Sequence, residues 1–320
     1  MTAMRHCCII GGSGFIGSHL VEQLLARNRR LTVIGRNPHP SRALPPGIDY
    51  LAGDYGDTYF LKGVLKGVDE VVSLAYSTVP KSSFEDPVYD ILSNLPSAVK
   101  LFEIAADHSI EKLVFVSSGG TVYGKAQTLP IPEDHPTNPI SAYGITKLAT
   151  EKYAQMFHEL KGLPVMCVRP ANAYGEGQKA FTGQGFVATA AATILEQRNV
   201  VLFGEIGTIR DYIHVTDVAT AIVAVLDHGS PGECYNIGSG IGRNNRDVLD
   251  ALIPLAKAVS LEVNITRKAA RRFDVPVNIL DSRKLQELSN WKPTVPFEEG
   301  IRKTWEWFFH SYARQYQKIA

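Results

Sequence analysis

Two residues one helical turn apart, Tyr143 and Lys147, carry side chains that together can move a proton. Ser141 precedes them as a candidate N-cap, so both side chains are expected on one face of a helix. An ammonium beside a phenol favours the phenolate, and a phenol whose pKa is lowered toward neutrality can take the proton of a hydroxyl. The alternative is an ordinary amphipathic helix with a surface tyrosine and lysine.

A glycine-rich turn lies ten residues from the start of the chain, within the run Ile9-Ile10-Gly11-Gly12-Ser13-Gly14-Phe15-Ile16-Gly17. An apolar run precedes this turn and a helix-like segment follows it, which is the order strand, tight turn, helix. Glycines let the backbone approach a pyrophosphate, and a helix N-terminus presents free N–H groups to its charge. The turn therefore predicts a dinucleotide site with contacts at Gly11, Gly14, Phe15, Ile16 and Gly17.

Strands and helices alternate through the first half of the chain. Short apolar runs predict strands at Cys7–Ile10, Leu31–Ile34, Tyr50–Ala52, Val71–Leu74, Leu113–Ser117 and Val165–Val168. Helical patterns between them cover Leu20–Arg27, Tyr59–Leu65, Leu92–Ala106 and Ser141–Glu159. This alternation predicts an α/β fold with a Rossmann-type, doubly wound parallel sheet that is covered by helices on both faces.

The pattern loosens after Pro170, where glycines crowd the stretch from Gly175 to Gly185. A chain of 320 residues is long enough for two domains. We expect an NAD(P)-binding Rossmann domain over residues 1–170. A smaller C-terminal α/β substrate-binding lobe is expected over residues 171–320, with the chain crossing back to the first domain around 213–240.

Composition excludes several classes of protein. The net charge is +1, without the basic excess of a nucleic-acid binder, and no apolar stretch approaches the ~20 residues of a membrane span. The first residues lack the apolar region of a signal peptide. The four cysteines have no metal-ligand spacing, so we expect buried thiols, no metal site and a reducing, cytoplasmic compartment.

Five longer motifs follow in order along the chain: Val168-Arg169-Pro170-Ala171-Asn172-Ala173-Tyr174-Gly175, Arg210-Asp211-Tyr212-Ile213-His214-Val215, Tyr235-Asn236-Ile237-Gly238-Ser239-Gly240, Arg271-x-x-Asp274 and Asn290-Trp291-x-Pro293. With these motifs, the glycine turn and the Tyr143–Lys147 pair, nearly the whole chain resembles the extended short-chain dehydrogenase/reductases. Within them it is similar to the nucleotide-sugar epimerases of the NAD-dependent epimerase/dehydratase family.

The resemblance implies a 4-epimerase that works through a transient 4-keto sugar with a bound nicotinamide cofactor. Tyr143 would be the base, and Lys147 would lower its pKa and hold the nicotinamide ribose. Beyond the glycine turn, the implied cofactor contacts are Asp54, Tyr55, Leu74, Ala75, Tyr76, Asn94, Ser117, Tyr143, Lys147 and Pro170. The implied substrate contacts are Asn172, Arg210, Arg271, Asp274 and Asn278.

Two of these contacts have simpler interpretations. In the simpler interpretation, Arg210 only forms a surface salt bridge with Asp211, and Arg271 only belongs to a solvated run of charges with Lys268 and Arg272. As diphosphate ligands, by contrast, the two guanidinium groups would match phosphate geometry with their forked donors.

The chain departs from the family pattern at Gly119, where a serine or threonine usually bonds the reacting oxygen. Ser118, Thr121 or a water must then supply the hydroxyl. The related dehydratases carry an acid two or three residues before the tyrosine of this segment, where this chain has Gly120 and Thr121. Elimination chemistry therefore lacks its acid.

A second departure is at the end of the second strand, where Gly35 replaces the acid that accepts from the ribose 2′-hydroxyl of NAD. The adjacent Arg36 has three interpretations: a ligand of the 2′-phosphate of NADP, a cation stacked on the adenine of NAD, or an exposed loop residue. Because an epimerase returns the hydride that it takes, we expect NAD and keep NADP as the alternative.

The expected substrate is a UDP-linked hexose or N-acetylhexosamine, because Asn278 is smaller than the aromatic residue that blocks 2-acetamido sugars in the family. No nucleic-acid or membrane partner is expected. A homodimer through helices 92–106 and 141–159 is expected. Two other functions stay open: an NADPH-dependent reductase of 4-keto nucleotide sugars and a non-catalytic NAD(P)-binding regulatory protein.

Overall fold

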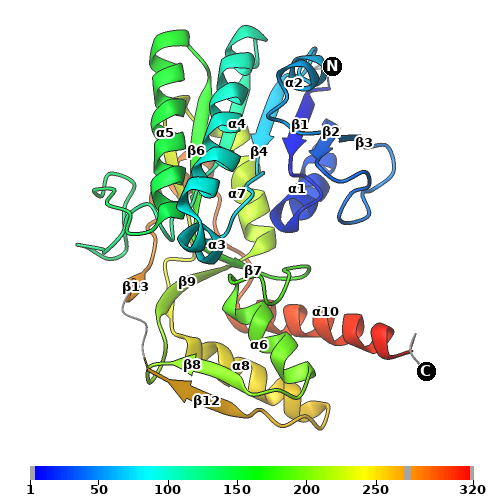
Figure 1. The fold of residues 1–320 in the computed structure, drawn as a ribbon, viewed down its shortest axis with the longest axis vertical. Coiled ribbons are helices and arrows are strands. Elements are labelled where there is room, and N and C mark those ends of the chain that lie inside the picture. Colours follow the sequence, from blue (N-terminus) through cyan, green and yellow to red (C-terminus); the bar gives the residue numbers. More distant parts are fainter. Residues whose placement is uncertain (1–3, 270–274, 318–320) are drawn as a thin grey trace.

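The computed structural model describes residues 4–269 and 275–317. Its first domain is built on a seven-stranded sheet whose neighbouring strands all pair in parallel (Figure 1). In spatial order the strands are β10 (Cys234–Ile237), β6 (Val165–Pro170), β5 (Lys112–Val116), β4 (Glu70–Ser73), β1 (His6–Ile10), β2 (Arg30–Gly35) and β3 (Asp49–Ala52). The expected doubly wound, Rossmann-type sheet is confirmed.

Helices cover both faces of this sheet, and each face has its own apolar core. The core on one face joins β1 to α1 (Phe15–Leu25), α7 (Val215–His228) and α9 (Arg283–Ser289). The core on the other face joins the sheet to α2 (Thr58–Val64), α4 (Pro87–Asp107) and α5 (Ala142–Lys161). Cys7 and Ile9 belong to the first core, and Cys8 and Ile10 to the second, because successive side chains of a strand point to opposite faces.

Two helices begin earlier than the sequence pattern indicated. Helix α1 begins at Phe15 rather than Leu20, because the glycine turn leads directly into the helix. Helix α4 begins at Pro87 rather than Leu92, since proline fits the first turn and Asp86 caps it by accepting from Tyr89 N at 2.9 Å. The short helix α3 (Pro80–Glu85), which precedes α4, was not expected.

The second lobe lies beyond the carboxyl ends of the sheet (Figure 1). It holds a small sheet around β9 (Ile209–His214), which pairs with β7 (Asn172–Tyr174), β11 (Gly242–Arg243) and β13 (Val277–Asn278). A separate parallel pair joins β8 (Val200–Phe203) to β12 (Ile265–Lys268). These strands pack with α6 (Phe186–Leu195), α8 (Asn245–Ala258) and α10 (Phe297–Gln317) around a third apolar core. Between β9 and β11 the chain returns to the first domain through α7 and β10.

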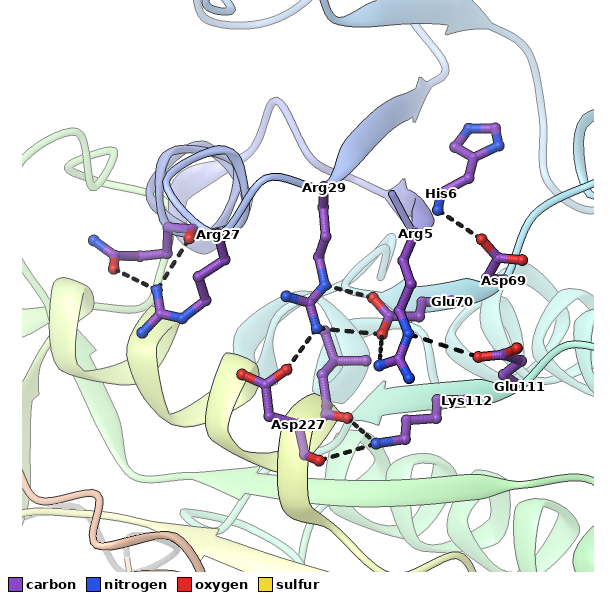
Figure 2. A network of polar contacts seen from close by, with 11 residues as sticks. Arg5, His6, Arg27, Arg29, Asp69, Glu70, Glu111, Lys112 and Asp227 are labelled. Carbon is purple, nitrogen blue, oxygen red and sulfur yellow. Dashed lines mark hydrogen bonds and ion pairs between the residues drawn. The ribbon is translucent and has the colours of Figure 1, made fainter. Parts of the chain in front are cut away.

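The amino edge of the large sheet is bound together by charged side chains (Figure 2). Glu70, fully buried at the start of β4, accepts from Arg29 Nε at 2.7 Å and from Arg5 Nη1 at 3.2 Å. Arg29 also bonds Asp227 of α7 at 2.5 Å, and Lys112 of β5 donates to the backbone oxygen of Asp227 at 3.1 Å. These contacts therefore connect α7 to β4 and β5, and to the residues directly before β1 and β2.

The thiols of Cys7, Cys8 and Cys167 are buried, as expected, and Cys234 is half-buried. None of the helices within the described residues combines the length and the apolar character that crossing a bilayer requires.

Candidate active site

The glycine turn between β1 and α1 has no room for side chains. Gly11 has a φ of +84°, and its amide donates to Ile34 O at 2.8 Å. A Cβ atom on Gly17 would lie 2.4 Å from Gly11 O, and one on Gly11 would lie 3.1 Å from Ala75 N. Gly14 is the N-cap of helix α1 and offers no capping side chain to the first N–H groups of the helix. The bare backbone and the helix N-terminus therefore fit a dinucleotide diphosphate.

A pocket of about 340 Å³ opens beside this turn at the carboxyl edge of the sheet. It brings together residues from both domains that the sequence had singled out: Gly11, Gly14, Phe15, Ile16, Gly17, Leu74, Tyr76, Ser117, Ser118, Tyr143, Lys147, Pro170 and Asn172. The candidate base thus shares one cavity with the candidate phosphate turn.

Helix α5 holds Tyr143 and Lys147 in the wall of this pocket. Ser141 caps the helix by accepting from Gly144 N at 3.2 Å. The Lys147 ammonium is buried and donates to Val116 O at 2.8 Å. Its Nζ lies 3.9 Å from the ring centroid of Tyr76 and 5.8 Å from that of Tyr143. The Tyr76 and Tyr143 rings meet edge to face at 4.9 Å.

Burial dominates the ionisation of this pair. Desolvation lowers the pKa of Lys147 to about 7, although the nearby carboxylates Glu151 and Asp90 favour its ammonium form. Burial raises the pKa of Tyr143 above its ordinary value, and the charge of Asp90 raises it further. The Tyr143–Lys147 spacing suggested a lowered phenol pKa, but burial and the charge of Asp90 raise the pKa of Tyr143 instead. The Lys147 ammonium contacts Val116 O and the Tyr76 ring.

Packing around the segment after β5 explains why position 119 holds a glycine and not a serine or threonine. A Cβ atom there would lie 2.4 Å from Leu280 Cδ1 and 2.8 Å from Arg169 O, so a larger residue does not fit. Ser118 lines the pocket, whereas Thr121 does not. A Cβ atom on Gly120 would lie 3.5 Å from Asn172 Oδ1 and 4.0 Å from Ser118 Oγ. Ser118 and Asn172 therefore face the same small space.

Several expected cofactor residues lie outside the lining of the pocket. Arg36 and Asp54 are exposed, and Tyr55 is buried beside them, where it feels the charges of both. Asn94 of α4 is buried and accepts from Ser77 N at 2.7 Å, so it holds the loop after β4 from behind. Ala75 forms this loop with its backbone close to the glycine turn.

The structure gives a packing reason for the missing acid at Gly35. A Cβ atom there would lie 2.4 Å from the hydroxyl of Tyr50. That hydroxyl donates to Asn37 O at 2.8 Å and so fixes the loop after β2. Tyr50 therefore occupies the space that a side chain at position 35 would need.

The expected substrate residues are spread over the second lobe. Arg210 lies on β9, where it pairs in register with Asn278 of β13. Asn278 is 1% exposed, lies outside the pocket lining and donates to Gly119 O at 3.0 Å. Arg271 and Asp274 lie outside the described residues.

The buried carboxylate of Asp211 is committed to the backbone of the segment 238–240. It accepts from Ser239 N at 2.8 Å and from Gly240 N at 3.1 Å. Leu280 N also donates to it at 3.2 Å. Asp211 therefore ties the end of β10 to the second lobe.

Sequence reasoning missed much of the pocket wall that the second lobe and the loop after β4 supply: Thr78, Val79, Val116, Ala171, Ala173, Tyr174, Gln178, Gln184, Gly185, Phe186, Val187 and Tyr212. The glycine-crowded stretch 175–185 was the available signal, since several of these residues follow its turns. The apolar side chains among them otherwise resemble those of any core.

The parallel sheet, the bare phosphate turn and the Tyr143–Lys147 pair define a nucleotide-dependent enzyme of the Rossmann class. The family model of the NAD dependent epimerase/dehydratase family matches residues 7–238. The chain is 33% identical to UDP-glucose 4-epimerase from Mycolicibacterium smegmatis over 94% of its own length and 97% of that protein. The chain belongs to this family of NAD-dependent epimerases.

Solved structures agree with this assignment. UDP-glucose 4-epimerase from Thermotoga maritima, crystallised with UDP-glucose, superimposes with a TM-score of 0.89 at 30% identity, covering 96% of this chain and 99% of that one. The UDP-glucose 4-epimerase of Thermus thermophilus in complex with NAD gives a TM-score of 0.87 at 33% identity, covering 95% and 99%.

Proposed function

We propose that this enzyme is a 4-epimerase of UDP-linked hexoses or N-acetylhexosamines. The observation that carries the proposal is the shared pocket, whose wall includes Tyr143 and Lys147, the glycine turn of the first domain and Asn172 of the second lobe. A base beside a hydride acceptor can oxidise a sugar hydroxyl, and a second lobe can hold the nucleotide while the sugar turns. Relatives named for UDP-glucose support the choice of nucleotide.

The residues present fit NAD. The turn at Gly11, Gly14 and Gly17 would hold the diphosphate, and Lys147, which has two N–H donors left, would hold the nicotinamide ribose. NAD, when bound, supplies the acceptor for the hydride of C4 and the donor for its return, together with a positive charge. The Lys147 ammonium and that charge both oppose the raised pKa of Tyr143.

Tyr143 would then do the proton chemistry. Its phenolate would take the proton of the sugar 4-hydroxyl during oxidation at C4, and the phenol would return that proton to the same oxygen when the 4-keto sugar is reduced. Ser118 and Asn172, which face the same space, would bond the reacting oxygen and the sugar. Arg210, Arg271 and Asp274 would hold the nucleotide, so binding energy from that remote part supports the reacting centre.

The test uses the purified enzyme without added cofactor. The wild type should carry bound NAD and interconvert UDP-glucose with UDP-galactose, or the two 2-acetamido sugars. Tyr143→Phe should keep its NAD and lose about 10²–10⁴-fold in turnover. Near-normal turnover of this variant would refute the role of Tyr143. Strict dependence on added NADPH would show the reductase instead, and bound NAD without turnover would show the regulatory protein.

The sugar class is open to a second assay. Asn278→Tyr would press a large ring against Gly119. The neighbouring Ser118 lines the pocket, so the ring would displace its wall. Loss of the acetamido pair alone would support control of sugar size by this position. An unchanged ratio of the two sugar pairs would exclude it.

The exposed faces of α4 and α5 support a homodimer. On α5 the exposed apolar residues Ile145, Tyr153, Met156 and Leu160 follow helical spacing. Helix α4 lies beside it (Figure 1) and exposes Val88, Ile91 and Leu92. Two such pairs of helices would bury a continuous apolar surface between copies of the chain. The free thiols support a reducing, cytoplasmic compartment for this dimer.

A further inference from the structure

Asp90 is a buried acid on α4 that the mechanism above does not use. Its side chain is 0% exposed. One carboxylate oxygen accepts from the hydroxyl of Thr78, and the other, also buried, has no hydrogen-bond partner among residues 4–269 and 275–317. A buried carboxyl oxygen without a partner costs folding stability, as is common for residues that serve function.

The contacts of Asp90 place it directly behind the pocket wall. Thr78 and Tyr76, on the loop after β4, both line the pocket. Asn94, one turn after Asp90 on α4, donates to Thr78 Oγ1 at 3.2 Å and to Asp90 O at 2.8 Å. The same amide accepts from Ser77 N at 2.7 Å. The loop is thus tied to the helix, with one hydrogen bond between Asp90 and a pocket residue.

Two buried carboxylates act on Lys147, and only one of them is neutralised by an ion pair in the described part of the chain. Glu151, one turn further along α5, is bound by Arg169 through contacts of 2.6, 3.1 and 3.2 Å. Asp90 has no cation within 4.0 Å among these residues, and Lys147 is the cation whose ionisation it affects. A carboxylate at Asp90 favours the protonated forms of Lys147, Tyr143 and Tyr76.

The other titratable groups facing the pair do not replace this charge. They are Tyr76, packed on both side chains, and Cys167 of β6, whose thiol pKa is raised well above its ordinary value by a hydrogen bond with Cys234 and by burial. The pKa of Tyr76 is raised as well, by burial first and by Asp90 next. Both shifts keep these two groups uncharged near neutral pH, so neither of them replaces a charge at position 90.

We propose that Asp90 is a positioning residue whose buried charge sets the protonation of Tyr143 and Lys147, and with it the pH range in which the enzyme works. The proposal rests on the epimerase function above. Removing the anion makes proton loss easier for both groups, because both lose a neighbour that favours the protonated form. The two limbs of the pH profile should therefore move in the same direction, toward lower pH.

The experiment compares Asp90→Asn with wild type in the NAD-bound enzyme. Both limbs of the profile of kcat/KM should shift down by about one pH unit. Asp86→Asn is the matched control, since it removes the same charge from the exposed N-terminus of the same helix. It should leave the profile in place, and Asp90→Glu should stay close to wild type because it keeps the charge.

A second readout does not depend on turnover. The absorbance of tyrosinate is titrated in wild type and in Asp90→Asn, and each curve is corrected with its Tyr143→Phe counterpart. The Tyr143 component should titrate at lower pH in the Asp90→Asn protein. If wild type lacks epimerase activity, the proposed function fails while this titration still tests Asp90.

Asp90→Asn should fold at least as well as wild type, because it removes an unpaired buried charge. A lower rate with unmoved limbs and an unmoved tyrosinate titration would overturn the proposal, and so would equal shifts in Asp86→Asn. Failure of Asp90→Asn to fold would also overturn it, since Asp90 would then belong to the fold.

Discussion

Lys147 is a lysine whose buried environment opposes its ordinary charge. Its side chain is 3% exposed and its pKa falls to about 7. Between about pH 7 and pH 10 the unfolded chain holds a proton that the folded chain has lost, so stability rises with pH over this range. Below about pH 7, Lys147 is protonated in both the folded and the unfolded chain. The folded protein then bears the full free-energy cost of burying the ammonium.

Replacing this ammonium should therefore stabilise the fold while destroying the site. Lys147→Met loses the bond to Val116 O but avoids the burial of charge, so we expect a gain on the order of 2 kcal/mol below neutrality. The gain should shrink as the pH rises toward 10. Urea unfolding at about pH 6 and about pH 9 measures it, with exposed Lys152→Met on the same helix as the control. A gain independent of pH would contradict the assignment.

Site residues could be predicted from the sequence where their partners are only a few positions away along the chain. Tyr143, Lys147 and the glycines could be chosen because one helical turn or one tight turn brings them together. Asp90 and Thr78 could not, because their pairing depends on how α4 packs behind the loop after β4. The same holds for Asn278, whose bond to Gly119 joins segments 159 residues apart.

The element that we propose for cofactor binding is the turn between β1 and α1. A methyl group on Gly17 would meet Gly11 O and Gly12 Cα at 2.4 and 2.6 Å, and these backbone atoms have no freedom to rotate away. Gly17→Ala must therefore push α1 from the turn that would hold the diphosphate.

We expect Gly17→Ala to lose at least about tenfold in affinity for NAD, as measured by titration calorimetry on cofactor-free protein. Gly63→Ala is the control, since nothing lies within 4 Å of its Cβ position in α2. That change should leave binding unaltered and stabilise the helix by up to about 1 kcal/mol. Equal affinities of the two variants would mean that the turn does not hold the dinucleotide.

Elements of the first domain could be predicted because buried parallel strands are continuous apolar runs, separated by helices of regular period. The second lobe could not be predicted in this way. Its strands β11 and β13 have two residues each, and β9 pairs with partners that are distant in sequence. Strands of that length carry no periodicity, so their pairing is decided by the cores around them.

For the whole molecule, the exposed stripe on α4 and α5 makes an assembly prediction. The double variant Leu92→Glu/Leu160→Glu should convert a dimer into a monomer, because it puts charge at two positions that are 66% and 73% exposed in the single chain. Sedimentation velocity measures the change. Leu288→Glu, on a 41% exposed residue of α9, should leave the assembly unaltered. A monomeric wild type would exclude this interface.

The ion-pair network at the amino edge makes a stability prediction (Figure 2). Glu70→Gln leaves Arg29 buried without its main partner, so we expect a loss of about 3–5 kcal/mol in the free energy of unfolding. Arg30→Gln breaks only the exposed pair with Asp49 at 3.4 Å and should cost less than about 1 kcal/mol. Urea unfolding of both variants measures the two losses. Equal losses would contradict a larger contribution of the buried pair to stability.

The direction of the strands has a practical consequence for anyone who engineers this enzyme. Because all seven strands run the same way, the ion-pair network lies at the amino edge of the sheet and the pocket lies at its carboxyl edge. Substitutions that raise thermal stability can then be selected at the amino edge without changing any pocket residue. Turnover then reports how much folded enzyme remains after heating. Pocket residues at the carboxyl edge can afterwards be varied in the stabilised protein to accept other substrates. The two rounds of mutagenesis change different residues, so the second does not reverse the first.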